Sequence, residues 1–146
     1  MSRSEGGFTL AESLLVLSVF MIVSSITAFT VKPQFEKAQA DSFLTQLQTD
    51  LYYAQQYSLT HQIETTVNIQ ADQHSYYIRT RFDQPLLVQR TYSNHIKVLP
   101  LSQPLFFKFT PDGNITKFGT LAIEAGSKTY RMTFLIGKGR FYVTEK

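Results

Sequence analysis

The chain has 146 residues and a mass of 16.7 kDa, a length typical of one domain with a modest core. Hydrophobic residues make up 43% and charged residues 17%, which excludes a chain that is disordered throughout. The absence of cysteine excludes a disulfide framework, a thiolate zinc site and a cysteine nucleophile. The net charge of +3 is unevenly distributed. Residues 1–63 carry three basic and five acidic side chains, whereas residues 64–146 carry eleven basic and six acidic ones, so the second part is the basic one.

A long apolar stretch lies near the beginning of the chain. Residues 14–31 carry no charge, and residues 8–31 carry only Glu12. As a helix this stretch would be about 36 Å long, enough to cross a hydrocarbon core of about 30 Å. A cleavable secretory signal is disfavoured, because its apolar region is shorter and is followed by a small-residue cleavage site. We therefore predict a transmembrane helix over residues 8–31.

Glu12 lies near the N-terminal end of this predicted helix, and its role there has two interpretations. In the first, it is a solvated acid at headgroup depth, favoured by the helix dipole in the first turn. In the second, it is kept because a specific cation compensates it, since an acid inside a membrane is costly. The spacing alone leaves both open.

The residues around Glu12 carry a resemblance. Gly7-Phe8-Thr9-Leu10-Ala11-Glu12, followed directly by the uncharged span, resembles the processing motif of type IV prepilins and type II secretion pseudopilins. The resemblance implies a leader at residues 1–7, cleavage between Gly7 and Phe8 by a prepilin peptidase, and N-methylation of Phe8 by the same enzyme. It also implies that Glu12 is required for assembly. In a stack of subunits this carboxylate would pair with the Phe8 amine of a neighbour, because opposed buried charges neutralise each other.

The helix is expected to continue beyond the membrane, from Phe8 to Thr60, with a kink near residues 29–32 caused by Pro33. Residues 32–61 are expected to form an amphipathic half. Six glutamines between residues 39 and 62 are expected on its solvated face, with Asp50 also off the apolar stripe. The apolar stripe comprises Leu44, Leu47, Leu51, Ala54 and Ser58. These six glutamines are Gln39, Gln46, Gln48, Gln55, Gln56 and Gln62.

After His61 the period changes from 3.6 to 2, which predicts a β head over residues 62–146. Short segments rich in β-branched and aromatic residues alternate with turn signals. They indicate a mainly antiparallel sheet or a small β-sandwich with the amphipathic helix as its cover. The expected strands are Thr65–Gln70, Tyr76–Phe82, Leu86–Tyr92, Ile96–Leu99, Leu105–Phe109, Leu121–Glu124, Arg131–Ile136 and Arg140–Val143.

A finer resemblance lies in the head. The stretches from Phe109 to Thr116, from Gly119 to Ile123 and from Ile136 to Val143 resemble H-type pseudopilins and FimT-like minor subunits. With the short length, they make the chain similar to minor pilins of the Gram-positive competence pilus, which takes up transforming DNA. This implies an α+β, type IV pilin-like fold. The protein would span the cell membrane once, head outside, before assembly, and would lie in the pilus at the cell surface afterwards. The implied partners are the peptidase, the major competence pilin, other minor pilins and the membrane.

Catalysis and metal binding find no support in the sequence. His61, His74 and His95 lack ligand spacing, and there is no phosphate-binding, dinucleotide or serine-hydrolase motif. Asp72, Asp83 and Asp112 lie in turn clusters, where aspartate bonds its own backbone. We therefore expect a protein without enzymatic activity, metal or cofactor.

Aromatic and basic residues alternate in two stretches, Tyr76–Phe82 and Arg140–Val143. The candidates for a weak DNA contact are Arg79, Arg81, Lys138 and Arg140. On a strand, Arg79 and Arg81 would share one face. The alternative is that these arginines only keep the outer face of a sheet solvated, and the basic charge would suit anionic cell-wall polymers or acidic neighbours equally. Three functions therefore stay open: a structural minor pilin, a DNA receptor on the filament, and a pseudopilin of a secretion system.

Overall fold

The structure is a computed structural model that describes residues 9–137 and 139–146. For residues 27–33 it describes the backbone alone. The chain divides into two compact units, residues 1–35 and residues 36–146. One helix, α1 (Leu10–His61), begins in the first unit and ends in the second. Its backbone is helical throughout, including at Pro33. The predicted helix ends therefore agree with the structure to within two residues.

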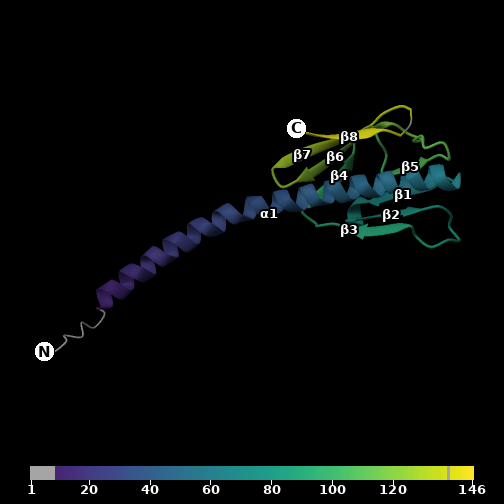
Figure 1. Cartoon of the computed structure of the whole chain (residues 1–146). Helices are drawn as coiled ribbons and strands as arrows, with labels where there is room; N and C mark the ends of the chain where they lie inside the picture. Colours follow the sequence, from purple (N-terminus) through teal and green to yellow (C-terminus); the bar gives the residue numbers. More distant parts are fainter. Residues whose placement is uncertain (1–8, 138) are drawn as a thin grey trace. The chain divides into compact units, whose positions relative to one another are not determined.

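The part of α1 in the second unit is amphipathic. Its buried side chains recur every three or four residues, the spacing that places them on one face of a helix. In Figure 1 this part of α1 runs along the sheets, with β2 and β3 on one side and β7 and β8 on the other. The buried apolar residues of α1 are Ala40, Phe43, Leu44, Leu47, Leu51 and Ala54.

Every strand predicted after His61 is present, and the turn after the first one contains a short 3₁₀ helix, η1 (Ala71–Gln73). Val, Ile, Thr, Phe and Tyr dominate the strands, as expected for residues that pack well on a pleated surface. The strands are β1 (Thr65–Gln70), β2 (Ser75–Arg79), β3 (Val88–Thr91), β4 (Ile96–Pro100), β5 (Phe106–Phe109), β6 (Gly119–Ala125), β7 (Lys128–Phe134) and β8 (Phe141–Glu145).

The strands form two antiparallel four-stranded sheets. Sheet A has the order β3-β2-β1-β5, and sheet B has the order β4-β6-β7-β8. The chain passes from one sheet to the other three times between β3 and β6. The predicted α+β fold is confirmed, and of the two expected forms of the head, one sheet or a small β-sandwich, the structure has two sheets.

One hydrophobic core joins the helix and both sheets. Phe107 of sheet A and Phe134 of sheet B meet with ring centroids 5.1 Å apart, and Tyr52 of α1 lies 4.5 Å from Phe141 of β8. Aromatic pairs of this kind stabilise a core beyond the area that they bury. The second unit therefore has its own complete core.

Two expected strands are shorter than predicted by two residues or more. The prediction ran from Tyr76 to Phe82, but β2 ends at Arg79, and β3 is limited to Val88–Thr91. The reason is a turn that begins early: the Thr80 hydroxyl donates to the Gln84 side chain at 2.8 Å, which closes the chain before Pro85.

The expectation that Gln55 is solvated was wrong. Gln55 is buried, and its side-chain amide donates to the Gly113 carbonyl at 2.8 Å. Gly113 has a φ of +75°, a conformation that glycine adopts at little cost, and it lies against Leu59 of α1. A Cβ on Gly139, in the β7–β8 hairpin, would approach the Gly113 carbonyl to 2.5 Å, so the hairpin and the turn pack backbone to backbone. Gln55 thus joins the end of α1 to both loops.

Candidate assembly site

The first turn of α1 places Glu12 at the beginning of the helix. The Glu12 backbone N–H donates to the Thr9 hydroxyl at 3.3 Å, the pattern of a capped helix N-terminus with an acid three residues later. The Glu12 side chain is exposed. Gly7 and Phe8, where the sequence predicts processing, lie outside the described residues. The carboxylate is therefore held in the first turn and stays accessible to a partner.

The helix that follows exposes apolar side chains on all sides. Four of them, Leu14, Leu15, Val16 and Leu17, are consecutive and so cover a whole turn. The exposed fractions of the large apolar side chains from Leu10 to Ile26 range from 51% at Val19 to 81% at Leu10. Among the described residues, no helix is long and apolar enough to cross a membrane.

Exposed apolar surface of this extent marks an interaction site. Fully burying one large apolar side chain contributes about 1.5–3 kcal/mol. The eleven large apolar side chains of this segment would together contribute on the order of 15–30 kcal/mol before the costs of association are subtracted. We call residues 10–26 the apolar segment.

A buried acid joins the helix to sheet A in the head. Asp50 accepts hydrogen bonds from the Tyr76 phenol at 2.7 Å and from Arg90 Nε at 3.2 Å, both at Oδ2. Gln46 donates to its Oδ1 at 3.0 Å. Burial raises the pKa of Tyr76 well above its ordinary value, and the hydrogen bond to Asp50 raises this pKa further. The arrangement keeps the phenol protonated and satisfies a carboxylate that is only 7% exposed.

Sequence reasoning placed Asp50 off the buried stripe, and the structure corrects this. Asp50 follows Leu47 by three residues and precedes Ala54 by four, so it continues the row that begins at Phe43. The heptad spacing of Phe43, Leu47, Asp50 and Ala54 was the signal that could have revealed it. Its partners Tyr76 and Arg90 were not predictable from spacing, because they lie on strands far along the chain.

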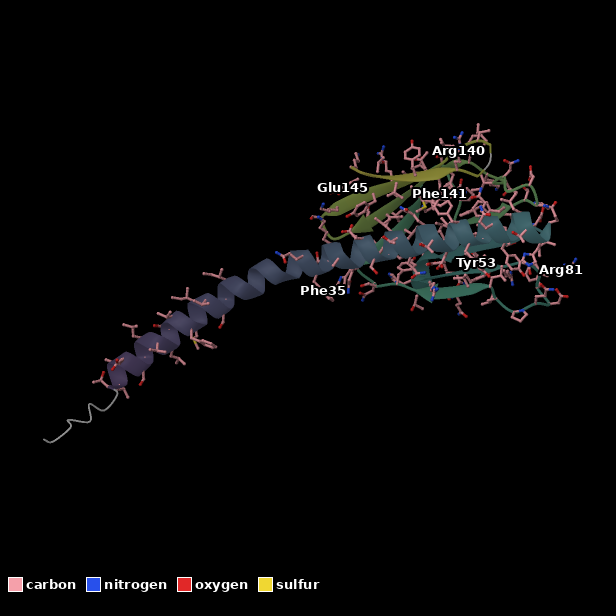
Figure 2. All side chains as sticks on the ribbon, in the orientation of Figure 1. Phe35, Tyr53, Arg81, Arg140, Phe141 and Glu145 are labelled. Carbon is pink, nitrogen blue, oxygen red and sulfur yellow. The ribbon has the colours of Figure 1, made fainter. Side chains whose placement is uncertain are left out.

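Of the four residues predicted to contact DNA, the structure describes three, and these do not form one patch. Arg79 ends β2, with its guanidinium 3.8 Å from the centre of the Phe82 ring, and Arg81 lies beyond the strand. Arg140 precedes β8 of sheet B, and Lys138 lies outside the described residues. In Figure 2, Arg81 and Arg140 are on opposite sides of α1. The structure therefore does not bring Arg81 and Arg140 together.

The histidines lie apart as well. His61 stacks on Tyr57 at the end of α1, His74 follows η1 with a φ of +47°, and His95 is exposed. Within the part of the chain that the structure describes, no three His, Cys, Asp or Glu side chains are grouped as metal ligands.

The arrangement of one helix on antiparallel sheets is that of a known structure, the minor pseudopilin EpsH from the type 2 secretion system of Vibrio cholerae. The TM-score is 0.52 at 14% identity, and the match covers 68% of this chain and 91% of the pseudopilin. No model of a known protein family matches the chain. In sequence, the chain is 26% identical over 144 residues to the competence protein ComGD of Bacillus subtilis (strain 168), covering 99% of this chain and 96% of the relative.

The chain thus has the fold of a minor pseudopilin. Over nearly its whole length, its sequence is similar to that of a competence protein, ComGD.

Proposed function

We propose that the protein is a minor pilin of a competence-type type IV pilus, at or near the tip of a filament needed for DNA uptake. The observation that carries the proposal is the apolar segment, which is exposed on all sides and has an accessible acid in its first turn. A pilin packs such a helix against the helices of its neighbours. The similarity to ComGD supports the competence system in particular.

In the proposed sequence of events, residues 8–31 first anchor the chain in the cell membrane with the head outside. A prepilin peptidase then cleaves between Gly7 and Phe8, and the same enzyme methylates the new amine of Phe8. The chain finally leaves the lipid and enters the filament. The protein has no catalytic part in these steps and needs no cofactor.

Glu12 sets the axial position of the subunit in this proposal. Its carboxylate pairs with the Phe8 amine of the neighbouring pilin, so that two charges that would each be costly among apolar helices neutralise one another. The hydrogen bond that the Glu12 backbone N–H donates to the Thr9 hydroxyl fixes the turn from which the carboxylate projects.

The experiment compares Glu12→Ala with Glu12→Gln and with the wild type in cells. We expect both variants to be inserted and processed normally but to be missing from sheared filaments, with at least a tenfold reduction for Glu12→Ala. Glu12→Asp, which keeps the charge, should retain part of the incorporation. Normal incorporation of Glu12→Ala would contradict the proposal.

A pseudopilin of a protein secretion system is the second candidate, because the similar fold belongs to one. The two functions are separated by the phenotype of a deletion strain. Loss of transformation with normal protein secretion supports the competence pilus, and the reverse result supports the pseudopilin.

A further inference from the structure

We propose that the outer face of sheet B contains a binding site for the phosphate backbone of a nucleic acid strand, centred on Arg131. The choice of nucleic acid as the ligand rests on the proposed function, whereas the site itself rests on the side chains described below.

The site is a shallow hollow of about 600 Å³ on the solvent side of the sheet. Arg131 lies in one cross-strand row with Ala122 and Thr144, and the next row contains Thr120, Thr133 and Tyr142. The intervening side chains, such as Met132, point into the core, so these two rows share the outer face. The lining residues are Leu101, Ser102, Thr120, Arg131, Thr133, Tyr142 and Thr144.

The chemistry of this lining suits a phosphate. One guanidinium is surrounded by five hydroxyl groups, and no lining residue is acidic. Arginine, serine, threonine and tyrosine side chains are the usual partners of phosphate oxygens in nucleic acid complexes. A carboxylate needs only the two N–H groups of an arginine fork, whereas the several oxygens of a phosphodiester also use donors around that fork.

The wall of the hollow is firmly held. The Thr120 carbonyl accepts bonds from the N–H groups of Leu101, Ser102 and Gln103, each at 3.2 Å, and the Thr120 N–H donates to the Ser102 hydroxyl at 2.9 Å. Gly119 allows this approach, because a Cβ there would lie 2.6 Å from the backbone of the same loop. The Ser102 side of the hollow is therefore positioned before a ligand arrives, which reduces the entropy lost on binding.

The charges of the two sheets differ in how far they are already paired. In sheet A, Arg90 is bonded to Asp50, Lys108 is paired with Glu64, and Arg79 lies against the Phe82 ring. In sheet B, Lys128 is paired with Glu145, but among the described residues no carboxylate forms an ion pair with Arg131. Sheet B therefore contains an arginine, Arg131, whose guanidinium has no ion pair among the described residues.

Two further cations extend the site along the edge of the sheet. Arg140 comes directly before β8 and Lys146 directly after it, and Figure 2 shows Arg140 and Glu145 at opposite ends of this strand. With Arg131 between them, they offer a basic track about 17 Å long, the length of a five-residue strand. The exposed Tyr142 ring lies on the same face and offers a surface for base stacking. A track with a stacking surface suits a polynucleotide better than a single anion.

The test measures fluorescence anisotropy of a labelled oligonucleotide, single-stranded and duplex, with the full chain in nonionic detergent. We expect Arg131→Ala to weaken binding about tenfold and to reduce the slope of log K against log salt by about one. Arg131→Lys should lie between the variant and the wild type, because it keeps the charge and loses the fork. The matched control is Arg81→Ala, which removes an exposed arginine near sheet A.

Equal affinities of Arg131→Ala and the wild type would overturn the proposal, and so would an equal loss in Arg81→Ala. Inorganic polyphosphate is the competitor: if it displaces DNA as well as unlabelled DNA does at equal phosphate concentration, the site is a general polyanion site and the assignment to nucleic acid is wrong. This binding assay does not involve filament assembly. A failure here leaves the Glu12 result standing, and a failure of the Glu12 test leaves this result standing.

Discussion

The two compact units of the chain differ in how far their apolar side chains are exposed, although one helix contributes to both. Leu47, in the head, is 1% exposed, whereas Leu17, thirty residues earlier on α1, is 53% exposed. The head satisfies its apolar side chains with its own sheets, so it needs no partner to be folded. The apolar segment has to obtain its burial from other molecules, and this is why we assign assembly to it.

The largest effect is expected from a charge in the apolar segment. Leu17→Asp should reduce the amount of protein in sheared filaments by at least tenfold, because a buried carboxylate without a partner is strongly unfavourable. Immunoblots of sheared and cell fractions measure it. Gln56→Asp, on an exposed position of the same helix within the head, is the control and should assemble normally. Normal assembly of Leu17→Asp would contradict the claim that the apolar segment is buried against other molecules.

A matched pair of truncations on the same helix sharpens the comparison. Leu47→Ala should lower the free energy of unfolding of the head by about 2–5 kcal/mol, because it leaves a cavity in a packed core. Leu17→Ala should leave that free energy within about 0.5 kcal/mol of the wild type, as is usual for exposed positions. Denaturant titration of the full chain in detergent, followed by tyrosine fluorescence, measures both. Equal losses would contradict the view that only the head has its own core.

Removing the buried acid of the head should have a smaller effect. Asp50→Ala leaves the buried Tyr76 phenol without an acceptor, and we expect a loss of about 2–3 kcal/mol in the same titration. Arg90→Ala should cost less than about 1 kcal/mol, because the Arg90 side chain is half exposed. Asp50→Asn keeps an acceptor and should lie between the two. A larger loss in Arg90→Ala than in Asp50→Ala would show that the ion pair, and not the phenol, dominates.

The smallest effect concerns alkaline pH. The pKa of Tyr76 is raised in the folded state above its ordinary value of 10.0. Above that pH the unfolded chain releases a proton that the folded chain retains, so stability falls as pH rises. Tyr76→Phe lacks this proton and should show a shallower loss of melting temperature above pH 10 than the wild type. Tyr92 and Tyr130, whose pKa values burial also raises, remain in both proteins and so cancel in the comparison. Identical slopes would mean that Tyr76 titrates normally.

Patterns within short windows of the sequence predicted most of the fold. The period of apolar residues predicted α1, and turn residues predicted the order and the approximate positions of the strands, since both are local properties. What could not be predicted depends on contacts between distant segments. Gln55 and Asp50 are polar residues whose burial is compensated by the Gly113 carbonyl and by Tyr76, and their own neighbours in sequence give no sign of these partners.

The same reasoning applies to the two proposed sites. The apolar segment with Glu12 is contiguous in sequence, so it was predictable, and its processing at Gly7 and Phe8 stays a prediction. The hollow around Arg131 combines side chains from β6, β7, β8 and the loop after β4. Only the register of the strands brings Arg131, Thr133 and Tyr142 together, and that register is not visible in a motif.

Mass spectrometry of the protein recovered from sheared filaments tests the central claim most directly. The account predicts that the chain is present in the filaments, that its N-terminal peptide begins at Phe8, and that this residue carries one added methyl group. A chain that still begins at Met1, or one that stays in the cell fraction while other pilins are sheared off, would contradict the claim that the exposed half of α1 is buried among other subunits.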